Sequence, residues 1–125
     1  LTPLKAMPHC YILLASGGVK SSTGEMFAKF DNAEEQYHPE MRKAIEGINA
    51  GDLNKLAAYL GNSFTPLWYG ERVSNICSYF ATSGALGCSL SGAGPTLFAL
   101  FDDKAKCESC AEICSPTEKS IETIE

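Results

Sequence analysis

The sequence predicts an α+β fold in which helices are layered on one face of a small antiparallel sheet. Apolar runs at 10–15, 88–90 and 96–101 have the length of buried strands, whereas residues 22–82 carry apolar side chains at helical spacing. A glycine-rich turn alone separates the last two runs, so we expect them to form an antiparallel hairpin. The chain has 125 residues, enough for a core of its own, and we expect a single domain over residues 1–125.

The first strand is expected at Cys10–Ala15, buried on both faces, because the run is short, apolar and rich in strand formers. The segment from Ser22 to Glu25 then has the spacing of a capping box, which predicts the start of a helix. One face of that helix would carry Met26, Phe27 and Phe30. Residues 31–37 are polar and are predicted to be a loop.

Three more helices are expected before residue 85. Pro39 suits the first position of one of them, whose apolar residues are Met41, Ile45 and Ile48. Asp52 suits the N-cap of the next, whose apolar stripe is Leu53, Leu56, Ala57, Leu60 and Phe64. The last follows Pro66 and Gly70, ends near Gly84, and carries Val73, Ile76, Cys77 and Phe80.

After Gly84 the apolar period changes to that of strands. We expect strands at Cys88–Leu90 and Thr96–Phe101, joined by the turn Ser91–Pro95. Asp102 or Asp103 is expected to cap a helix that runs toward Cys114 and ends at Ser115-Pro116. Residues 121–124 are predicted to add an edge strand.

Composition and charge exclude several partners. The net charge is −5 and no block of lysine or arginine is present, so nucleic acid and anionic membranes are not expected to bind. The longest apolar run is too short to span a bilayer, and the first residues lack the pattern of a signal peptide. We therefore expect a cytoplasmic protein with reduced thiols, and the missing initiator methionine suggests a piece of a longer chain.

The glycine-rich turn is the candidate functional site. It consists of Ser91, Gly92, Ala93, Gly94, Pro95 and Thr96. Glycines let the backbone take positive φ, and successive N–H groups in such a loop can bind an anion, with the flanking hydroxyls as further donors. A hairpin that merely needs glycine is the alternative interpretation, although a two-residue hairpin would need less of it.

Two other patterns resemble binding motifs, but a purely structural role explains each of them better. The segment Gly17–Ser21 lacks the second glycine that a phosphate-binding Walker motif needs directly before its lysine, which favours a simple strand-to-helix turn. Cys107, Cys110 and Cys114 resemble a metal-binding run, but no fourth ligand follows at a suitable spacing. Because they lie on one side of a helix, we expect them to pack as small apolar side chains without bound metal.

Residues 84–101 resemble the third signature motif of the GHMP kinase superfamily. Within that superfamily, three other stretches are similar to the 4-diphosphocytidyl-2-C-methyl-D-erythritol kinases. These stretches are Leu1–Leu4 with Met7-Pro8, Val19–Phe27, and Ala50–Asn62. The resemblance covers nearly the whole chain.

The resemblance implies a ferredoxin-like C-terminal domain of a kinase that transfers the γ-phosphate of ATP, with Mg²⁺, to a hydroxyl of 4-diphosphocytidyl-2-C-methyl-D-erythritol. It places the ATP loop and the catalytic residues in an N-terminal kinase domain that this sequence lacks, so no catalytic residue is assigned here. The Ser91–Thr96 turn would line the phosphate side of the substrate site. Trp68 and Tyr69 would either cover a core edge or stack on the cytidine ring.

Departures from the pattern leave other interpretations open. Ser16-Gly17-Gly18 replaces a segment that usually contains proline, and Ala93 stands where serine is common. Homoserine kinase or another GHMP kinase therefore remains an alternative, as does a binding module that reuses the fold without catalysis.

Overall fold

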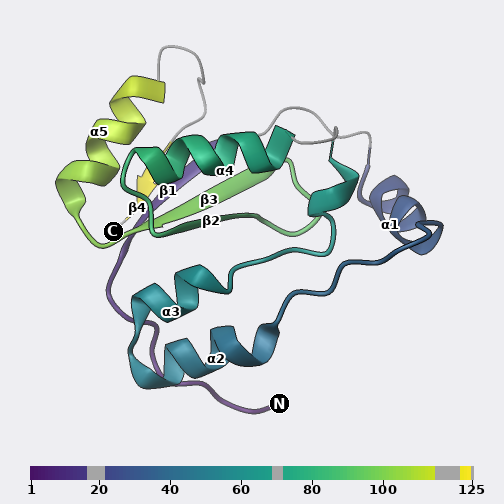
Figure 1. Cartoon of the computed structure of the whole chain (residues 1–125), viewed down its shortest axis with the longest axis horizontal. Coiled ribbons are helices and arrows are strands. Elements are labelled where there is room, and N and C mark those ends of the chain that lie inside the picture. The colour runs from purple at the N-terminus through teal and green to yellow at the C-terminus, as the bar shows by residue number, and fades with distance from the viewer. Residues whose placement is uncertain (17–21, 69–71, 115–121, 125) are drawn as a thin grey trace.

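The computed structural model describes residues 1–16, 22–68, 72–114 and 122–124. Its elements follow the predicted order of strand, four helices, two strands, helix and strand, with one short 3-10 turn added (Figure 1). They are β1 (Tyr11–Ser16), α1 (Thr23–Asp31), α2 (Met41–Ala50), α3 (Leu53–Ala58), η1 (Thr65–Leu67), α4 (Arg72–Thr82), β2 (Gly87–Leu90), β3 (Thr96–Phe101), α5 (Lys104–Cys114) and β4 (Glu122–Ile124). The segment Gly17–Ser21 and the predicted helix stop at Ser115-Pro116 lie outside the described residues.

The strands of the described residues form a four-stranded antiparallel sheet in the order β2-β3-β1-β4. β1 and β3 lie at its centre, with Leu13 opposite Ala99. β2 pairs with β3 across the glycine-rich turn, with Leu90 opposite Leu97. The predicted α+β class, antiparallel hairpin and edge strand near the C-terminus are confirmed, and β2 forms the other edge.

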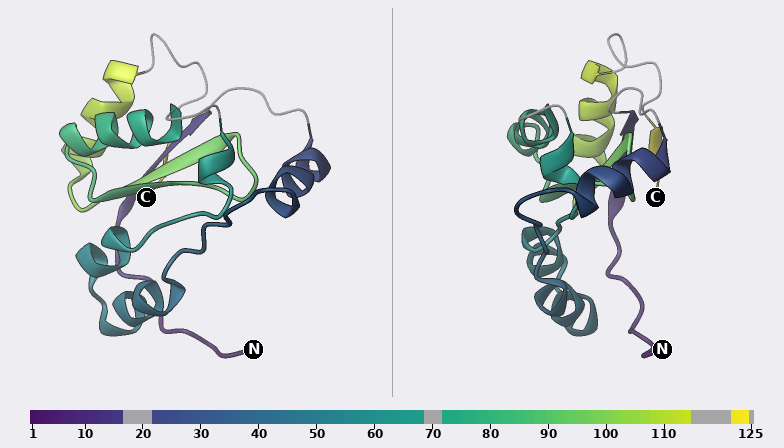
Figure 2. Two further views of the ribbon diagram at one scale, coloured as in Figure 1. Left: turned by 45° about the vertical axis from the view of Figure 1, so that its right-hand side comes forward. Right: turned by 90° about the vertical axis from the view of Figure 1, so that its right-hand side faces the viewer.

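Helices cover both faces of this sheet (Figures 1 and 2). On one face of the sheet, Leu13, Ala99 and Phe101 pack against α4 and α5, which form the one layer of helices that was predicted. On the opposite face of the sheet, Ile12 and Leu100 pack against α2 and α3, a second layer that was not predicted. Because β1 and β3 are apolar on both faces, a second layer of helices is needed to keep water from the other face.

Local signals position the helix ends. Ser22 is the N-cap of α1, and its Oγ accepts a hydrogen bond from the backbone N–H of Glu25 at 3.0 Å. Asp103, rather than Asp102, caps α5, since its Oδ1 accepts from the N–H of Lys106 at 3.1 Å. Gly84 follows α4 with a φ of 100°, the left-handed conformation that ends helices.

The structure corrects three predicted helix faces. Phe27 and Met41 lie on the predicted apolar faces but are 52% and 59% exposed, so neither belongs to the buried part of its helix. α2 instead buries Ala44 and Gly47, because small residues let its backbone come close to α3. α3 ends at Ala58, so the predicted stripe to Phe64 is wrong beyond that point. No helix among the described residues has the length and apolar character needed to cross a membrane.

Candidate functional site

The six predicted site residues form one compact turn between β2 and β3. Ser91 donates its backbone N–H to the carbonyl of Thr96 at 2.8 Å, which closes the turn. Inside it, the N–H of Gly94 donates to the carbonyl of Ser91 at 2.9 Å. Gly92 and Gly94 have φ of 53° and 84°, and the Gly94–Pro95 peptide bond is cis. The turn therefore needs both glycines for its own backbone path.

Asn62 holds the turn from the side. Its Nδ2 donates to the carbonyl of Leu90 at 2.9 Å and to that of Gly92 at 2.8 Å. Its Oδ1 accepts from the N–H of Phe64 at 2.8 Å, which fixes the orientation of the amide. In the sequence, Asn62 stands only at the end of the stretch 50–62 that resembles the family, and nothing there predicts its contact with the turn. An asparagine just after a helix was the sole local signal.

Trp68 packs against the turn and is hydrogen-bonded to it. Its Nε1 donates to the carbonyl of Ala93 at 3.1 Å, and its side chain is 3% exposed. A Cβ added to Gly94 would lie 2.4 Å from the Trp68 ring atom Cζ2, so the ring packs directly on this glycine. The interpretation of Trp68 as a core-edge residue is confirmed, while Tyr69 lies outside the described residues.

Two N–H groups of the turn point outward in the sense that they point away from its internal hydrogen bonds; Gly92 is exposed, and Ala93 is 9% exposed. The carbonyl of Gly92 points to Asn62, so the N–H of Ala93, in the same planar peptide, points the opposite way. The carbonyl of Ser91 points to Gly94, which directs the N–H of Gly92 away from the turn's interior. Within the described residues neither N–H meets an acceptor. Two successive N–H groups of this kind suit the oxygen of an anion such as phosphate.

A cavity of about 350 Å³ lies beside the turn. The segment 60–66, α4 and the edge strand β2 form its walls. Asn62 belongs to both features, since it lines the cavity and bonds the turn. The lining adds hydroxyls from Thr65, Ser74 and Ser89, and none of its described residues is charged. A small neutral group therefore fits this space best.

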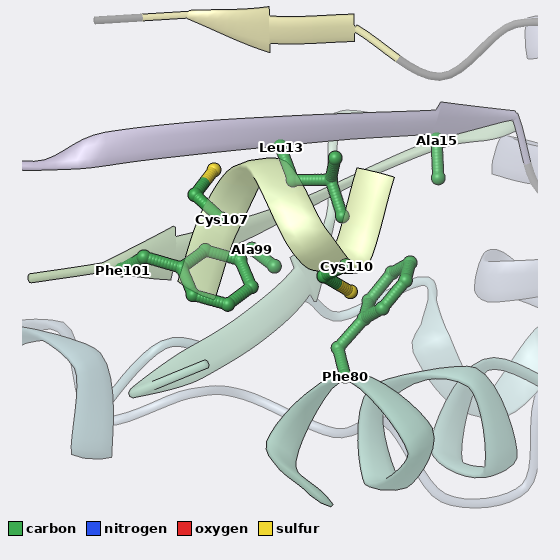
Figure 3. Packing of buried hydrophobic residues seen from close by; sticks show 7 residues of the cluster. All are labelled: Leu13, Ala15, Phe80, Ala99, Phe101, Cys107 and Cys110. Carbon is green, nitrogen blue, oxygen red and sulfur yellow. The ribbon is translucent and has the colours of Figure 1, made fainter. Parts of the chain in front are cut away.

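The cysteines of α5 pack in the core. Cys107 and Cys110 are 0% and 1% exposed and belong to one buried cluster with Leu13, Phe80 and Phe101, in which Cys110 lies next to the ring of Phe80 (Figure 3). Their interpretation as small apolar side chains is confirmed, and the side chain of Cys114 lies outside the description. Among the described residues, no three His, Cys, Asp or Glu side chains gather in a way that could hold a metal ion.

Comparison with known proteins agrees with this geometry. Residues 41–115 match the family described as "GHMP kinases C terminal". A curated relative from Lachnospira eligens, named 4-diphosphocytidyl-2-C-methyl-D-erythritol kinase, is 34% identical over 116 residues, which are 90% of this chain and 40% of the relative. The chain thus spans about 40% of the length of the curated relatives it matches.

Solved structures show the same fold at lower identity. The mevalonate kinase of L. major, in complex with R-mevalonate, superposes with a TM-score of 0.72 at 21% identity, over 99% of this chain and 45% of that one. A 4-(cytidine 5'-diphospho)-2C-methyl-D-erythritol kinase superposes with a TM-score of 0.66 at 16% identity, over 98% of this chain and 44% of that one. The matched segment and the shared fold together show that this chain belongs to the GHMP kinase C-terminal family.

Proposed function

We propose that this chain is the C-terminal, substrate-side domain of an ATP-dependent kinase that phosphorylates a hydroxyl of 4-diphosphocytidyl-2-C-methyl-D-erythritol. The reaction would belong to the non-mevalonate isoprenoid pathway in the cytoplasm. Curated relatives with this name, at 31–34% identity, support the choice of substrate. The observation that carries the site is the Ser91–Thr96 turn, whose two outward N–H groups suit a phosphate oxygen.

The turn would act by positioning and by electrostatic stabilisation. Phosphoryl transfer needs little covalent chemistry from the protein, and hydrogen-bond donors held in place before the reaction stabilise the charge on phosphate oxygens. Asn62 and Trp68 hold three carbonyls of the Leu90–Ala93 segment, so the N–H groups of Gly92 and Ala93 are oriented in advance. The neutral cavity beside the turn would accept an uncharged part of the substrate.

ATP, Mg²⁺ and the catalytic residues are assigned to an N-terminal kinase domain that would be the partner of this chain. The bound nucleotide supplies the γ-phosphoryl group that is transferred. In the described residues the outward N–H groups of the turn fit a phosphate oxygen, whereas no set of acidic side chains fits a metal ion.

A substrate panel tests the proposal on the complete protein encoded by the native gene. With ATP and Mg²⁺, we expect phosphorylation of 4-diphosphocytidyl-2-C-methyl-D-erythritol and none of homoserine or mevalonate, measured by mass spectrometry of the products. Phosphorylation of homoserine instead would replace the proposed substrate. No phosphorylation of any acceptor would favour a binding module.

An activity assay of the 125-residue chain by itself tests the proposed division of roles between the two domains. We expect the chain to fold and to show no acceptor-dependent ATP hydrolysis or transfer above a blank. Turnover by this chain alone would show that the catalytic residues lie within it, and the division of roles would be wrong.

A further inference from the structure

Two thiols meet on the wall of the cavity beside the turn. Cys77 comes from α4 and Cys88 from the edge strand β2, and both are half-buried. Both side chains pack against the same buried cluster around Leu90 and Leu97, and a hydrogen bond between them shifts the pKa of each thiol. The inference drawn from this pair is independent of the proposed kinase activity.

The hydrogen bond makes the two thiols chemically different. The donated proton stabilises the Cys77 thiolate and lowers the pKa of Cys77, even though burial acts in the opposite direction. The same bond raises the pKa of Cys88, and burial and the charges of Cys77 and Cys110 raise it further. Tyr37 is the other titratable group on the described cavity wall. Cys77 is therefore the nucleophile of the pair, and Cys88 holds the proton.

Accessibility also separates this pair from the other described thiols. Cys107 and Cys110 are at most 1% exposed in the core, and Cys10 is buried between β1, α2 and α3. Cys77 and Cys88 instead line an open cavity whose described walls carry no charge. A small neutral reagent can reach them without unfolding the protein.

We propose that Cys77 and Cys88 form a redox-reactive pair, which a small neutral disulfide reaches through this cavity and oxidises to an intramolecular disulfide between α4 and β2. The Cys77 thiolate attacks one sulfur of the reagent, forms a mixed disulfide and releases the other half as a thiolate. Cys88 gives its proton to that thiolate, attacks the Cys77 sulfur and releases the second half as a thiolate, which takes up from solvent the proton that Cys77 lost on ionising. The protein thiols lose two electrons and two protons in total, and the reagent gains them as two thiols.

Oxidation ties α4 to the strand that leads into the turn. Cys88 lies two residues before Leu90, whose carbonyl bonds to Asn62. The new covalent bond therefore restrains the cavity wall and the strand on which the turn is built.

The test uses the 125-residue chain in a Cys114→Ser background, which removes the thiol whose side chain is not described. After native incubation with bis(2-hydroxyethyl) disulfide, intact-mass spectrometry should show the loss of two hydrogen atoms, and peptide mapping should find a Cys77–Cys88 bond. In the Cys88→Ser variant, one hydroxyethylthio group should stay on Cys77, because no second thiol can displace it.

Alkylation of the chain without any substitution is a second test, and it does not depend on how a cysteine variant folds. Iodoacetamide should label Cys77 about 10-fold or more faster than Cys10, Cys107 or Cys110, with a pH midpoint below that of an ordinary thiol. Equal labelling of all thiols would overturn the proposal. A disulfide mapped to another pair, or a Cys88→Ser chain without the mixed disulfide, would overturn it as well.

Discussion

Gly92 and Gly94 share a positive φ but have different surroundings. A Cβ on Gly92 would meet nothing within 4 Å, whereas a Cβ on Gly94 would lie 2.4 Å from the Trp68 ring. A side chain at Gly94 therefore costs packing energy as well as backbone strain, and it would lower stability along with activity. Gly92 is the position at which the role of the turn in phosphate binding can be separated from folding.

Gly92→Val in the complete protein tests that role. The side chain would fill the space beside the outward N–H groups, and we expect kcat/KM to fall on the order of 100-fold. The strain at positive φ should lower the free energy of unfolding by only about 1–3 kcal/mol. Steady-state kinetics and urea unfolding on the same samples measure both effects.

Gly51→Val is the matched control. Gly51 has a φ of 67°, its added Cβ would also meet nothing within 4 Å, and it lies between α2 and α3, away from the turn. It should lose similar stability and keep kcat/KM near that of the unsubstituted enzyme. If the two variants have the same kinetics, the turn is only a hairpin and the site assignment fails.

Asn62 makes the turn dependent on a segment distant in sequence. We expect Asn62→Ala to lower the free energy of unfolding by about 1–3 kcal/mol, because the half-buried carbonyl of Leu90 and the exposed carbonyl of Gly92 both lose their donor. Asn62→Asp keeps an acceptor for the N–H of Phe64 but removes both donors. Chemical denaturation should find Asp nearly as damaging as Ala. A neutral Asn62→Asp would show instead that Asn62 matters only for its bond to Phe64.

At the scale of elements, α2 and α3 pack through a glycine. A Cβ on Gly47 would lie 2.6 Å from the backbone N of Leu56, closer than real Cβ atoms come to such an atom. This close approach explains why the small residues of α2, rather than Met41, form its buried face. It also sets the distance at which the helix pair covers Leu100.

Replacing Gly47 with alanine should therefore reverse the usual effect of alanine in a helix. Alanine ordinarily stabilises a helix by about 1 kcal/mol relative to glycine, but here we expect a loss of about 1–3 kcal/mol from overpacking. Gly24→Ala in α1 is the control, since its Cβ would meet only Ser22 Oγ at 3.9 Å, and it should be neutral or stabilising. Thermal melts of both variants compare them, and a stabilised Gly47→Ala would contradict the close packing.

The end of α3 shows how an element boundary depends on tertiary contacts. The chain leaves the helix after Ala58, and a Cβ on Gly61 would lie 2.7 Å from Pro39. Phe64, expected on the helical stripe, instead packs edge-on against Phe27 at a centroid distance of 5.0 Å. The segment after α3 thereby reaches the edge of β2, where Asn62 meets the turn.

At the scale of the whole molecule, buried thiols link stability to pH. Burial raises the pKa of Cys10 in the folded chain above its value of about 8.5 in the unfolded chain. The stability contributed by the neutral thiol is therefore complete below about pH 8.5 and is lost as the pH rises toward the folded pKa.

We expect the free energy of unfolding to fall more steeply above about pH 8.5 for the unsubstituted chain than for Cys10→Ala, in which this titration is removed. Cys77 and Cys88 titrate in both proteins, so the difference between the two curves isolates Cys10. Urea unfolding across this pH range measures it. Parallel curves would mean that Cys10 has the same pKa in the folded and unfolded chains.

The elements and their order could be predicted from the sequence because their signals are local. The caps Ser22 and Asp103, the stop at Gly84 and the apolar runs act within a few residues of the backbone they organise. The position of the Ser91–Thr96 turn and its need for positive φ were visible in the same way. The superfamily resemblance in turn depended on that glycine pattern.

The supports of the site were decided by the tertiary structure alone. Asn62 bonds to Leu90 across 28 positions, and Trp68 bonds to Ala93 across 25 positions. The second helical layer, the buried face of α2 and the Cys77–Cys88 pair likewise depend on which surfaces meet when the sheet is covered. Local sequence sets backbone preferences over a few residues, whereas these contacts exist only after distant segments pack together to bury apolar area.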